Sequence, residues 1–192
     1  MGAREETIRI STFFFLLFTP FSSYMTILTH IYETAHLSAI GPATLSCNYV
    51  AFITSTFVAP AIRLPLKVQL MIGALAYTFN YSSGIYASMT DEPVYKYLIS
   101  CFGSTVAGLS GGLLWVSQGR YIHLVCKKYG VVSRKGEMYG IFSFFYCLSS
   151  VSAGLITTFG LGFFDAQTYF FIITALGIIS ILFCLFFVRP IS

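Results

Sequence analysis

Six long apolar segments constrain the fold of this chain more than any other feature of its sequence. They span residues 10–31, 37–62, 66–87, 94–124, 139–161 and 168–188. Each is close to the roughly 20 residues that a helix needs to cross the hydrocarbon core of a bilayer. The segments are continuous, without polar alternation or closely spaced turns, which favours helices over the strands of a membrane barrel. We therefore predict an all-helical membrane protein in which residues 1–192 form a single six-helix domain.

The low content of charged residues excludes a soluble domain. Asp, Glu, Lys and Arg make up 9% of the chain, whereas soluble domains carry about 25%. The 20 Phe and 13 Tyr residues suit a lipid-facing surface with aromatic side chains near the membrane interfaces. We expect an integral, multi-pass protein that has the lipid bilayer as its first partner.

Charged residues alternate between the two sides of the predicted helices. All basic residues but Lys96 fall on one side, and these are Arg4, Arg9, Arg63, Lys67, Arg120, Lys127, Lys128, Arg134, Lys135 and Arg189. The other side holds the acidic residues Glu33, Asp91, Glu92 and Asp165. By the positive-inside rule, both termini are expected on the cytosolic side, or in the matrix if the membrane is mitochondrial. The net charge of +4 is therefore interpreted as a topology signal, and no nucleic-acid partner is expected.

Small residues follow two adjacent rows along the fourth segment. Ser100, Ser104, Gly108 and Gly112 recur every four residues, and Gly103, Ala107 and Gly111 lie beside them. Rows of this kind let a neighbouring helix approach closely in lipid. The simpler interpretation is helix packing alone. The alternative is a helix that slides or rocks against its neighbour during a conformational cycle.

Five residues in or beside the apolar segments are candidates for polar or gating roles. Trp115, Gln118 and Arg120 close the fourth segment, while Asn48 and Asn80 lie within the second and third. Polar groups at membrane depth are costly, so they usually face a bundle interior, a cavity or an interface. Arg120 either extends to the cytosolic interface or holds a gate, and Trp115 is either an interfacial anchor or a cavity wall. The asparagines either bond across helices or contact a substrate.

Residue patterns typical of enzymes and metal sites are missing from the sequence. It has no phosphate-binding loop and no His-Glu-x-x-His, and its paired carboxylates are Glu5–Glu6, placed in an N-terminal tail, and Asp91–Glu92, in a loop. No Cys-x-x-Cys pair occurs, so the cysteines are interpreted as small apolar packing residues. These are Cys47, Cys101, Cys126, Cys147 and Cys184. We expect no catalytic residues, no metal and no cofactor.

Two stretches of the sequence resemble a known family. Residues 113–121, Leu-Leu-Trp-Val-Ser-Gln-Gly-Arg-Tyr, follow a glycine-rich run and resemble the fourth span of the uncoordinated-ninety-three family of ion-channel regulatory proteins. Residues 139–150 are similar to that family's fifth span. The resemblance implies one half of a major facilitator superfamily bundle, the N-terminal six helices. The loop at 60–67 departs from the superfamily pattern because it contains neither Asp nor Gly.

The resemblance and the residues leave two functions open. The resemblance implies a regulatory or structural partner within a larger membrane complex, working with other membrane-protein subunits. The alternative is a secondary transporter of an ion or small solute, completed by a second six-helix half or by a homodimer. Transporters are often built from inverted three-plus-three repeats, but the first and last three segments share no convincing identity. The lack of acidic residues deep in any segment favours the regulatory or structural role.

Overall fold

Six α-helices form the fold of the computed structural model, which describes residues 2–34 and 39–191, and all of their side chains except those of 29–34 and 161. The helices are α1 (Ala3–Thr34), α2 (Ile40–Val58), α3 (Leu66–Met89), α4 (Pro93–Lys128), α5 (Lys135–Phe163) and α6 (Ala166–Phe187). Two short 3₁₀ turns, Ala59–Ala61 and Val132–Arg134, complete the regular structure. The described residues contain no strand, so the predicted all-helical class is confirmed for them.

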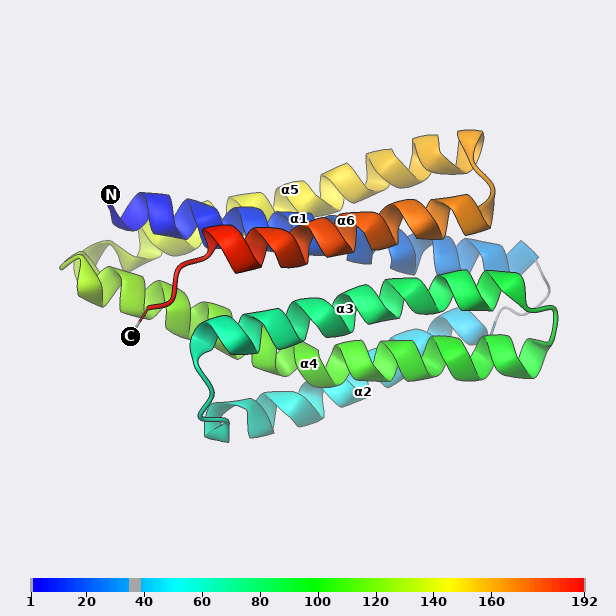
Figure 1. The fold of residues 1–192 in the computed structure, drawn as a ribbon, viewed down its shortest axis with the longest axis horizontal. Helices are drawn as coiled ribbons and strands as arrows, with labels where there is room; N and C mark the ends of the chain where they lie inside the picture. The colour runs from blue at the N-terminus through cyan, green and yellow to red at the C-terminus, as the bar shows by residue number, and fades with distance from the viewer. Residues whose placement is uncertain (1, 35–38, 192) are drawn as a thin grey trace.

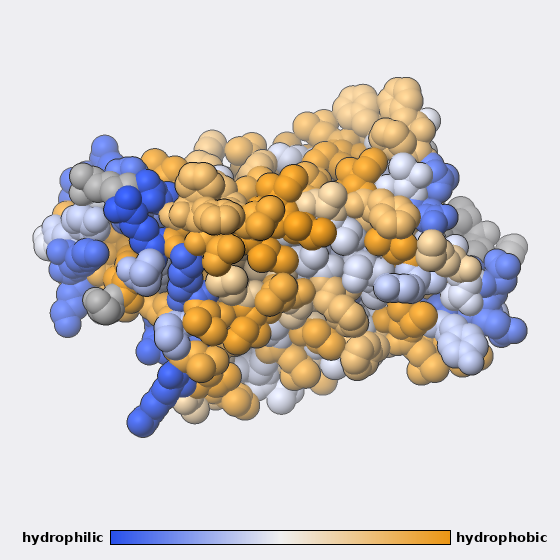
Figure 2. Space-filling view, in the orientation of Figure 1, coloured by the Kyte–Doolittle hydropathy of each residue, from blue (hydrophilic) through white to orange (hydrophobic). Residues whose placement is uncertain are grey.

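The helices lie side by side, and consecutive helices run in opposite directions (Figure 1). Both ends of the chain lie at the same end of the bundle as the α2–α3 and α4–α5 connections. We call this the basic end, because it carries Arg4, Arg63, Lys128 and Arg134. Hydrophilic side chains gather at the two ends of the molecule, and an apolar band lies between them (Figure 2).

Helix packing follows a repeated pattern. Helix α4 packs between α2 and α3, and α1 packs in the same way between α5 and α6. Helices α3 and α6 pack against each other and join the two groups. Exchanging α1 with α4, α2 with α5 and α3 with α6 therefore reproduces these pairings, with the helix directions reversed (Figure 1). An inverted three-plus-three arrangement is thus present in the packing although it was not found in the sequence.

Four helices are long and apolar enough to cross a membrane. Among the described residues these regions are Ala3–Leu28, Pro93–Lys128, Val132–Gly160 and Ala166–Phe187. Helices α2 and α3 are long enough, at 19 and 24 residues, but they are outside this set because polar residues lower their mean hydropathy. The structure therefore supports a multi-pass membrane protein, but not the predicted count of six spans.

Helix α1 begins earlier than expected. The placement of Glu5 and Glu6 in a tail is wrong, because α1 starts at Ala3 and both carboxylates lie in its first turn. Acidic groups there interact favourably with the positive end of the helix dipole. Glu6 is also buried, at 3% exposure, on the side of α1 that continues through Ile10 and Phe14.

Proline and glycine explain two other boundaries. Helix α2 stops at Val58 rather than at 62 because Pro60 cannot donate the hydrogen bond that an α-helix interior requires, and a 3₁₀ turn follows. The expected start of this segment at 37 lies outside the described residues. Helix α4 continues past the expected end at 124 to Lys128. Gly130 then turns the chain away from the helix, because its φ of 66° lies in the left-handed region. The Val131 N–H then donates to the Cys126 carbonyl at 2.9 Å, as in a Schellman cap.

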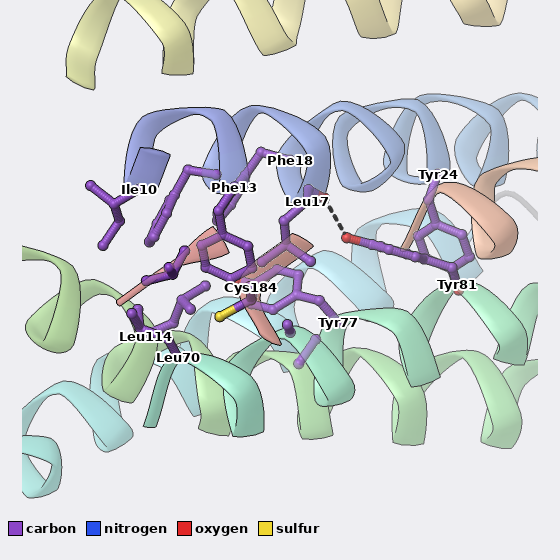
Figure 3. Packing of buried hydrophobic residues seen from close by; sticks show 14 of the residues in the cluster. Ile10, Phe13, Leu17, Phe18, Tyr24, Leu70, Tyr77, Tyr81, Leu114 and Cys184 are labelled. Carbon is purple, nitrogen blue, oxygen red and sulfur yellow. Dashed lines mark hydrogen bonds between the residues drawn. The ribbon is translucent and has the colours of Figure 1, made fainter. Parts of the chain in front are cut away.

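Aromatic and aliphatic side chains of α1 form the centre of the core. Figure 3 shows Ile10, Phe13 and Leu17 directed toward Leu70 and Leu114 of the facing helices. The Tyr81 hydroxyl donates to the Leu17 carbonyl at 2.6 Å (Figure 3), so this phenol is satisfied although it is fully buried. These side chains thus connect α1 to α3 and α4, in addition to its main packing against α5 and α6.

Both ends of the apolar helix α6 are capped by charged side chains. At its C-terminus, Arg9 donates to the Phe187 carbonyl at 3.3 Å and Lys67 donates to the Leu185 carbonyl at 2.6 Å. Cations are favourable at this end of a helix. At its N-terminus, Asp165 accepts from the Thr168 hydroxyl at 2.6 Å and from the Thr168 N–H at 3.2 Å. These bonds hold the pKa of Asp165 below its ordinary value.

Candidate functional site

The contact between α4 and α2 is a close approach of two backbones. A Cβ on Gly108 would collide with the Asn48 carbonyl and lie 2.8 Å from the Ala51 Cβ. A Cβ on Gly112 would collide with the Ser55 hydroxyl, which donates to the Gly108 carbonyl at 3.1 Å and accepts from the Gly112 N–H at 3.1 Å. Larger side chains at these positions would force the helices apart.

The remaining small residues of α4 face α3 or lie between α2 and α3. A Cβ on Gly103 would lie 2.5 Å from the Ser83 hydroxyl, and one on Gly111 would lie 3.0 Å from the Tyr77 hydroxyl and 2.8 Å from the Phe52 ring. Three others are fully buried in the same contact surface, namely Ser100, Ser104 and Ala107. All seven small residues singled out in the sequence therefore lie on buried faces of α4.

A chain of buried polar groups crosses four helices behind this contact. The Asn48 amide of α2 donates to the Ser104 carbonyl at 3.1 Å, and the Ser104 hydroxyl donates to the Asn80 side-chain oxygen at 3.4 Å. The Ser83 hydroxyl donates to the Asn80 carbonyl at 2.6 Å and contacts the Tyr24 hydroxyl of α1 at 3.2 Å. Both asparagines thus form bonds across helices. The amide nitrogen of Asn80 finds no hydrogen-bond partner among the described residues.

An open groove lies between α2 and α5. These two helices make no close backbone contact within the described part of the chain, and α1, α3 and α4 form the floor between them. The groove contains a hollow of about 430 Å³. Seven of its eleven lining residues are aromatic, and the lining comprises Phe18, Phe21, Ser22, Met25, Leu45, Asn48, Tyr49, Phe52, Tyr77, Trp115 and Tyr146. None of these described side chains is charged.

Trp115 lines the floor of this groove, away from either end of α4. Its ring centroid is 5.4 Å from that of Phe18, 5.1 Å from Tyr146 and 6.0 Å from Phe142. Rings at these separations, in tilted or edge-to-face arrangements, stabilise one another beyond simple burial. Trp115 therefore links α1, α4 and α5 at the base of the groove.

Gln118 and Arg120, two of the candidates for polar or gating roles, lie on different faces of α4. Residues two apart on a helix point to opposite sides. Gln118 is buried at 4% exposure, and its amide nitrogen has no hydrogen-bond partner among the described residues. Arg120 is exposed. The two side chains therefore have different surroundings, one inside the bundle and one at its surface.

Two buried polar residues near the basic end were missed in the candidate set. The Glu6 carboxylate accepts from the Tyr121 hydroxyl at 3.4 Å and lies 4.0 Å from the Arg189 guanidinium. Gln69 is fully buried, donates to the Leu64 carbonyl at 2.6 Å and accepts from the Ser117 hydroxyl at 2.6 Å.

Helical spacing could have revealed Glu6, and Gln69 was marked, like Asn80, as a polar side chain inside the third apolar segment. Glu6 is one turn before Ile10, on the buried face of α1. The role of Gln69 depends on where the α2–α3 connection lies against α4, and local sequence does not carry that information.

Titratable groups do not gather into a metal site. In the part of the chain that the structure describes, no group of three or more His, Cys, Asp and Glu residues is close enough to hold an ion. The groups that line the groove and could contact a bound molecule are aromatic rings, three phenols, the Ser22 hydroxyl and the Asn48 amide.

Comparisons with known proteins add no family to this description. The sequence matches no protein-family model, and no curated protein matches it significantly.

Proposed function

We propose that this protein crosses the membrane six times, with both termini on the cytosolic side, and acts as a regulatory or structural partner in a larger membrane complex. In this proposal another membrane protein covers the groove between α2 and α5. The resemblance to ion-channel regulatory proteins of the uncoordinated-ninety-three family points in the same direction. The proposal depends most on an exposed row of small residues along α5.

That row borders the groove. Its members are exposed and are spaced three or four residues apart, and they are Gly140, Ser143, Cys147, Ser150, Gly154 and Thr158. A Cβ added to Gly140 or Gly154 would meet nothing within 4 Å. Ser143 and Ser150 lie one turn before and after Tyr146, which lines the groove. In lipid, such rows are the surfaces on which helices associate, and the buried row on α4 already packs in this way within the bundle.

The polarity of the groove also favours a protein cover over lipid. Its lining includes a hydroxyl and three phenols, beside the Asn48 amide, which already donates to the Ser104 carbonyl. A hydrogen-bonding group without a partner costs roughly 4–8 kcal/mol in a purely apolar medium. A second hollow, on the outer flank of α2 and α4, is different, because its three hydroxyls already donate to carbonyls of their own helices. Lipid suits that flank, whereas a partner with hydrogen-bonding groups suits the groove.

The Gly154→Leu variant tests the proposal. Its side chain enters open space in the isolated chain, so the bundle should fold normally while close docking against α5 is blocked. We expect a stoichiometric complex on native gels after mild extraction of the wild-type protein, and its loss in Gly154→Leu. Ser46→Leu is the matched control, because Ser46 is also exposed but lies on the outer flank of α2 and α4, away from the row. A wild-type protein that extracts only as a monomer would refute the proposal.

The groove also supports a second candidate, a secondary transporter completed by a second six-helix unit or a second copy. A hollow of about 430 Å³ is within the roughly 300–1,000 Å³ typical of small-molecule sites. Its uncharged aromatic lining suits an aromatic or apolar organic solute better than a bare inorganic ion. Asn48 and Tyr77 are the polar groups nearest to such a solute.

Reconstitution separates the second candidate from the first. If the protein is a transporter, liposomes that contain the purified protein are expected to take up an aromatic solute. Asn48→Ala should reduce that uptake more than Asn80→Ala, because Asn48 lines the groove and Asn80 does not. If no solute in a panel of apolar and aromatic compounds crosses the vesicle membrane, the transporter candidate fails and the partner role is unaffected.

A further inference from the structure

We propose that the groove between α2 and α5 binds a quaternary ammonium ion in its hollow, held by the faces of aromatic rings. This inference rests on the second candidate function, a groove that takes a small solute, and it names the chemical class of that solute. It concerns binding only, so its test is separate from the tests of transport and of complex formation.

Aromatic rings from four helices surround the hollow. The ring centroid of Phe18 in α1 is 5.3 Å from that of Tyr77 in α3, 5.4 Å from Trp115 in α4 and 5.4 Å from Tyr146 in α5. These three pairs are inclined at 55°, 58° and 74°, and Trp115 meets Tyr146 at 83°. The four rings therefore do not stack in parallel on one another, and their faces point in several directions. We call them the ring cage.

A second layer of rings holds the ring cage in place. Phe14 stacks on Phe18 with a centroid distance of 5.6 Å, and Phe142 stacks on Tyr146 at 6.4 Å. Both supporting rings are buried and neither lines the hollow. A site that is already ordered before a ligand arrives loses less conformational freedom on binding, which favours affinity.

Tyr77 contributes a polar atom for which the bundle supplies no partner. The residue is only 3% exposed, and no described residue forms a hydrogen bond with its hydroxyl. A Cβ added to Gly111 would lie 3.0 Å from this hydroxyl oxygen and 2.8 Å from the ring of Phe52, another lining residue. A hydroxyl that is buried without a partner is costly. It is free to rotate and turn an oxygen lone pair toward a cation in the hollow.

The positive charge of the ligand follows from the electrostatics of the rings. Ring faces carry negative partial charge, and they attract a cation within about 6 Å of the centroid, Trp most strongly. No described lining residue is acidic, so nothing replaces the water shell of a bare metal ion, and none is basic, so nothing repels a cation. A quaternary ammonium group has no N–H donor to satisfy, and aromatic cages are its usual binding sites in proteins.

The chain reports on this site through its only tryptophan, Trp115. The experiment titrates the purified full chain, in a maltoside detergent without phospholipid, with choline and follows the emission of Trp115. Equilibrium dialysis with labelled choline provides an independent measure of binding. The uncharged comparison is 3,3-dimethylbutan-1-ol, which has a carbon atom in place of the nitrogen. We expect saturable binding of choline and about tenfold weaker binding of the alcohol.

Two tyrosines of α2 and α3 form a matched pair for substitution. Tyr49 lines the hollow and is 60% exposed, whereas Tyr86 lies outside it and is 61% exposed. Tyr49→Leu should weaken choline binding about 2- to 5-fold, the range of a cation–π contact at an exposed site. Tyr86→Leu should leave the affinity unchanged.

Phosphatidylcholine headgroups carry the same quaternary ammonium group as free choline, and nanodiscs distinguish the two sources. In phosphatidylglycerol nanodiscs, free choline should change the emission of Trp115 as it does in detergent. If phosphatidylcholine nanodiscs give this change without added choline, and Tyr49→Leu reduces it, the lipid headgroup also occupies the site.

Equal affinity for choline and 3,3-dimethylbutan-1-ol overturns the inference, because the hollow would then recognise shape and not charge. Choline that fails to bind overturns it, and so does a loss of affinity that is as large in Tyr86→Leu as in Tyr49→Leu. Uptake of a neutral aromatic solute into liposomes without choline binding removes this inference alone and leaves the transporter candidate in place.

Discussion

At the scale of single residues, Gly108 shows how the lack of one side chain determines a helix contact. The space that a side chain at this position would need is already occupied by the Asn48 carbonyl and the Ala51 side chain of α2. Backbone atoms cannot move aside as the end of a flexible side chain can, so the contact tolerates no Cβ.

Replacing Gly108 by alanine should therefore destabilise the fold, although alanine is the better helix former. We expect a loss of about 1–3 kcal/mol, typical of overpacking. Thermal unfolding in detergent measures the effect. Gly140→Ala is the control, because its Cβ enters open space and should leave the unfolding midpoint unchanged or raise it. Equal behaviour of the two variants would mean that α2 and α4 are not in backbone contact.

Gln69 joins three segments through one side chain. It holds the α2–α3 connection through the Leu64 carbonyl and reaches α4 through the Ser117 hydroxyl. Gln69→Leu keeps the volume but removes the donor to the Leu64 carbonyl and the acceptor of the buried Ser117 hydroxyl, so we expect a loss of stability of about 1–3 kcal/mol. The half-buried Gln167, replaced in the same way, provides the comparison. Limited proteolysis of the α2–α3 connection should be faster in Gln69→Leu only, and equal rates would contradict this role.

At the scale of helices, Asp165 makes the start of α6 sensitive to acid. Its folded-state pKa is below the ordinary value of 3.8 because Thr168 donates two hydrogen bonds to the carboxylate. The stabilising contribution is therefore complete above that ordinary value and is lost as the pH falls through the lowered pKa.

We expect the unfolding midpoint of Asp165→Asn to depend less on pH than that of the wild type below about pH 4. The asparagine retains a capping oxygen without a titratable group. Thermal unfolding of both proteins across this range makes the comparison. If their pH profiles coincide, the Asp165 carboxylate does not stabilise α6.

The sequence predicts much of this helical framework, because hydrophobicity is a local property. The apolar runs identify six helices, and the four-residue spacing from Ser100 to Gly112 identifies the face of α4 that packs. The start of α1 at Ala3 was missed because it places the buried carboxylate of Glu6 on the helix. The end of α2 at Val58 was missed although Pro60 marks it in the sequence. The partners of Glu6 and Gln69 and the place of Trp115 in the groove depend on which helices become neighbours. Hydrophobicity alone does not determine that choice.

At the scale of the whole molecule, the basic end predicts a common location for the two termini. Arg4 pairs with Glu137 at 2.5 Å and Arg9 caps α6, so both the start and the end of the chain are held at this end. Epitope tags placed at either terminus should both be accessible only from the cytosolic side in sealed cells. Tags on opposite sides would show that an odd number of helices crosses the membrane, and the six-span proposal would then be wrong.

The two walls of the groove also differ in mechanical stiffness. On one side, α5 is fixed to α1 by interlocking rings such as Phe14 and Phe142, whose centroids are 5.0 Å apart. On the other side, α2 lies against the small residues of α4, and the Asn48 and Ser55 side chains hydrogen-bond across that contact. We therefore expect the stiffness of the α2 wall to depend on these hydrogen bonds, whereas that of the α5 wall depends on the packing of its rings.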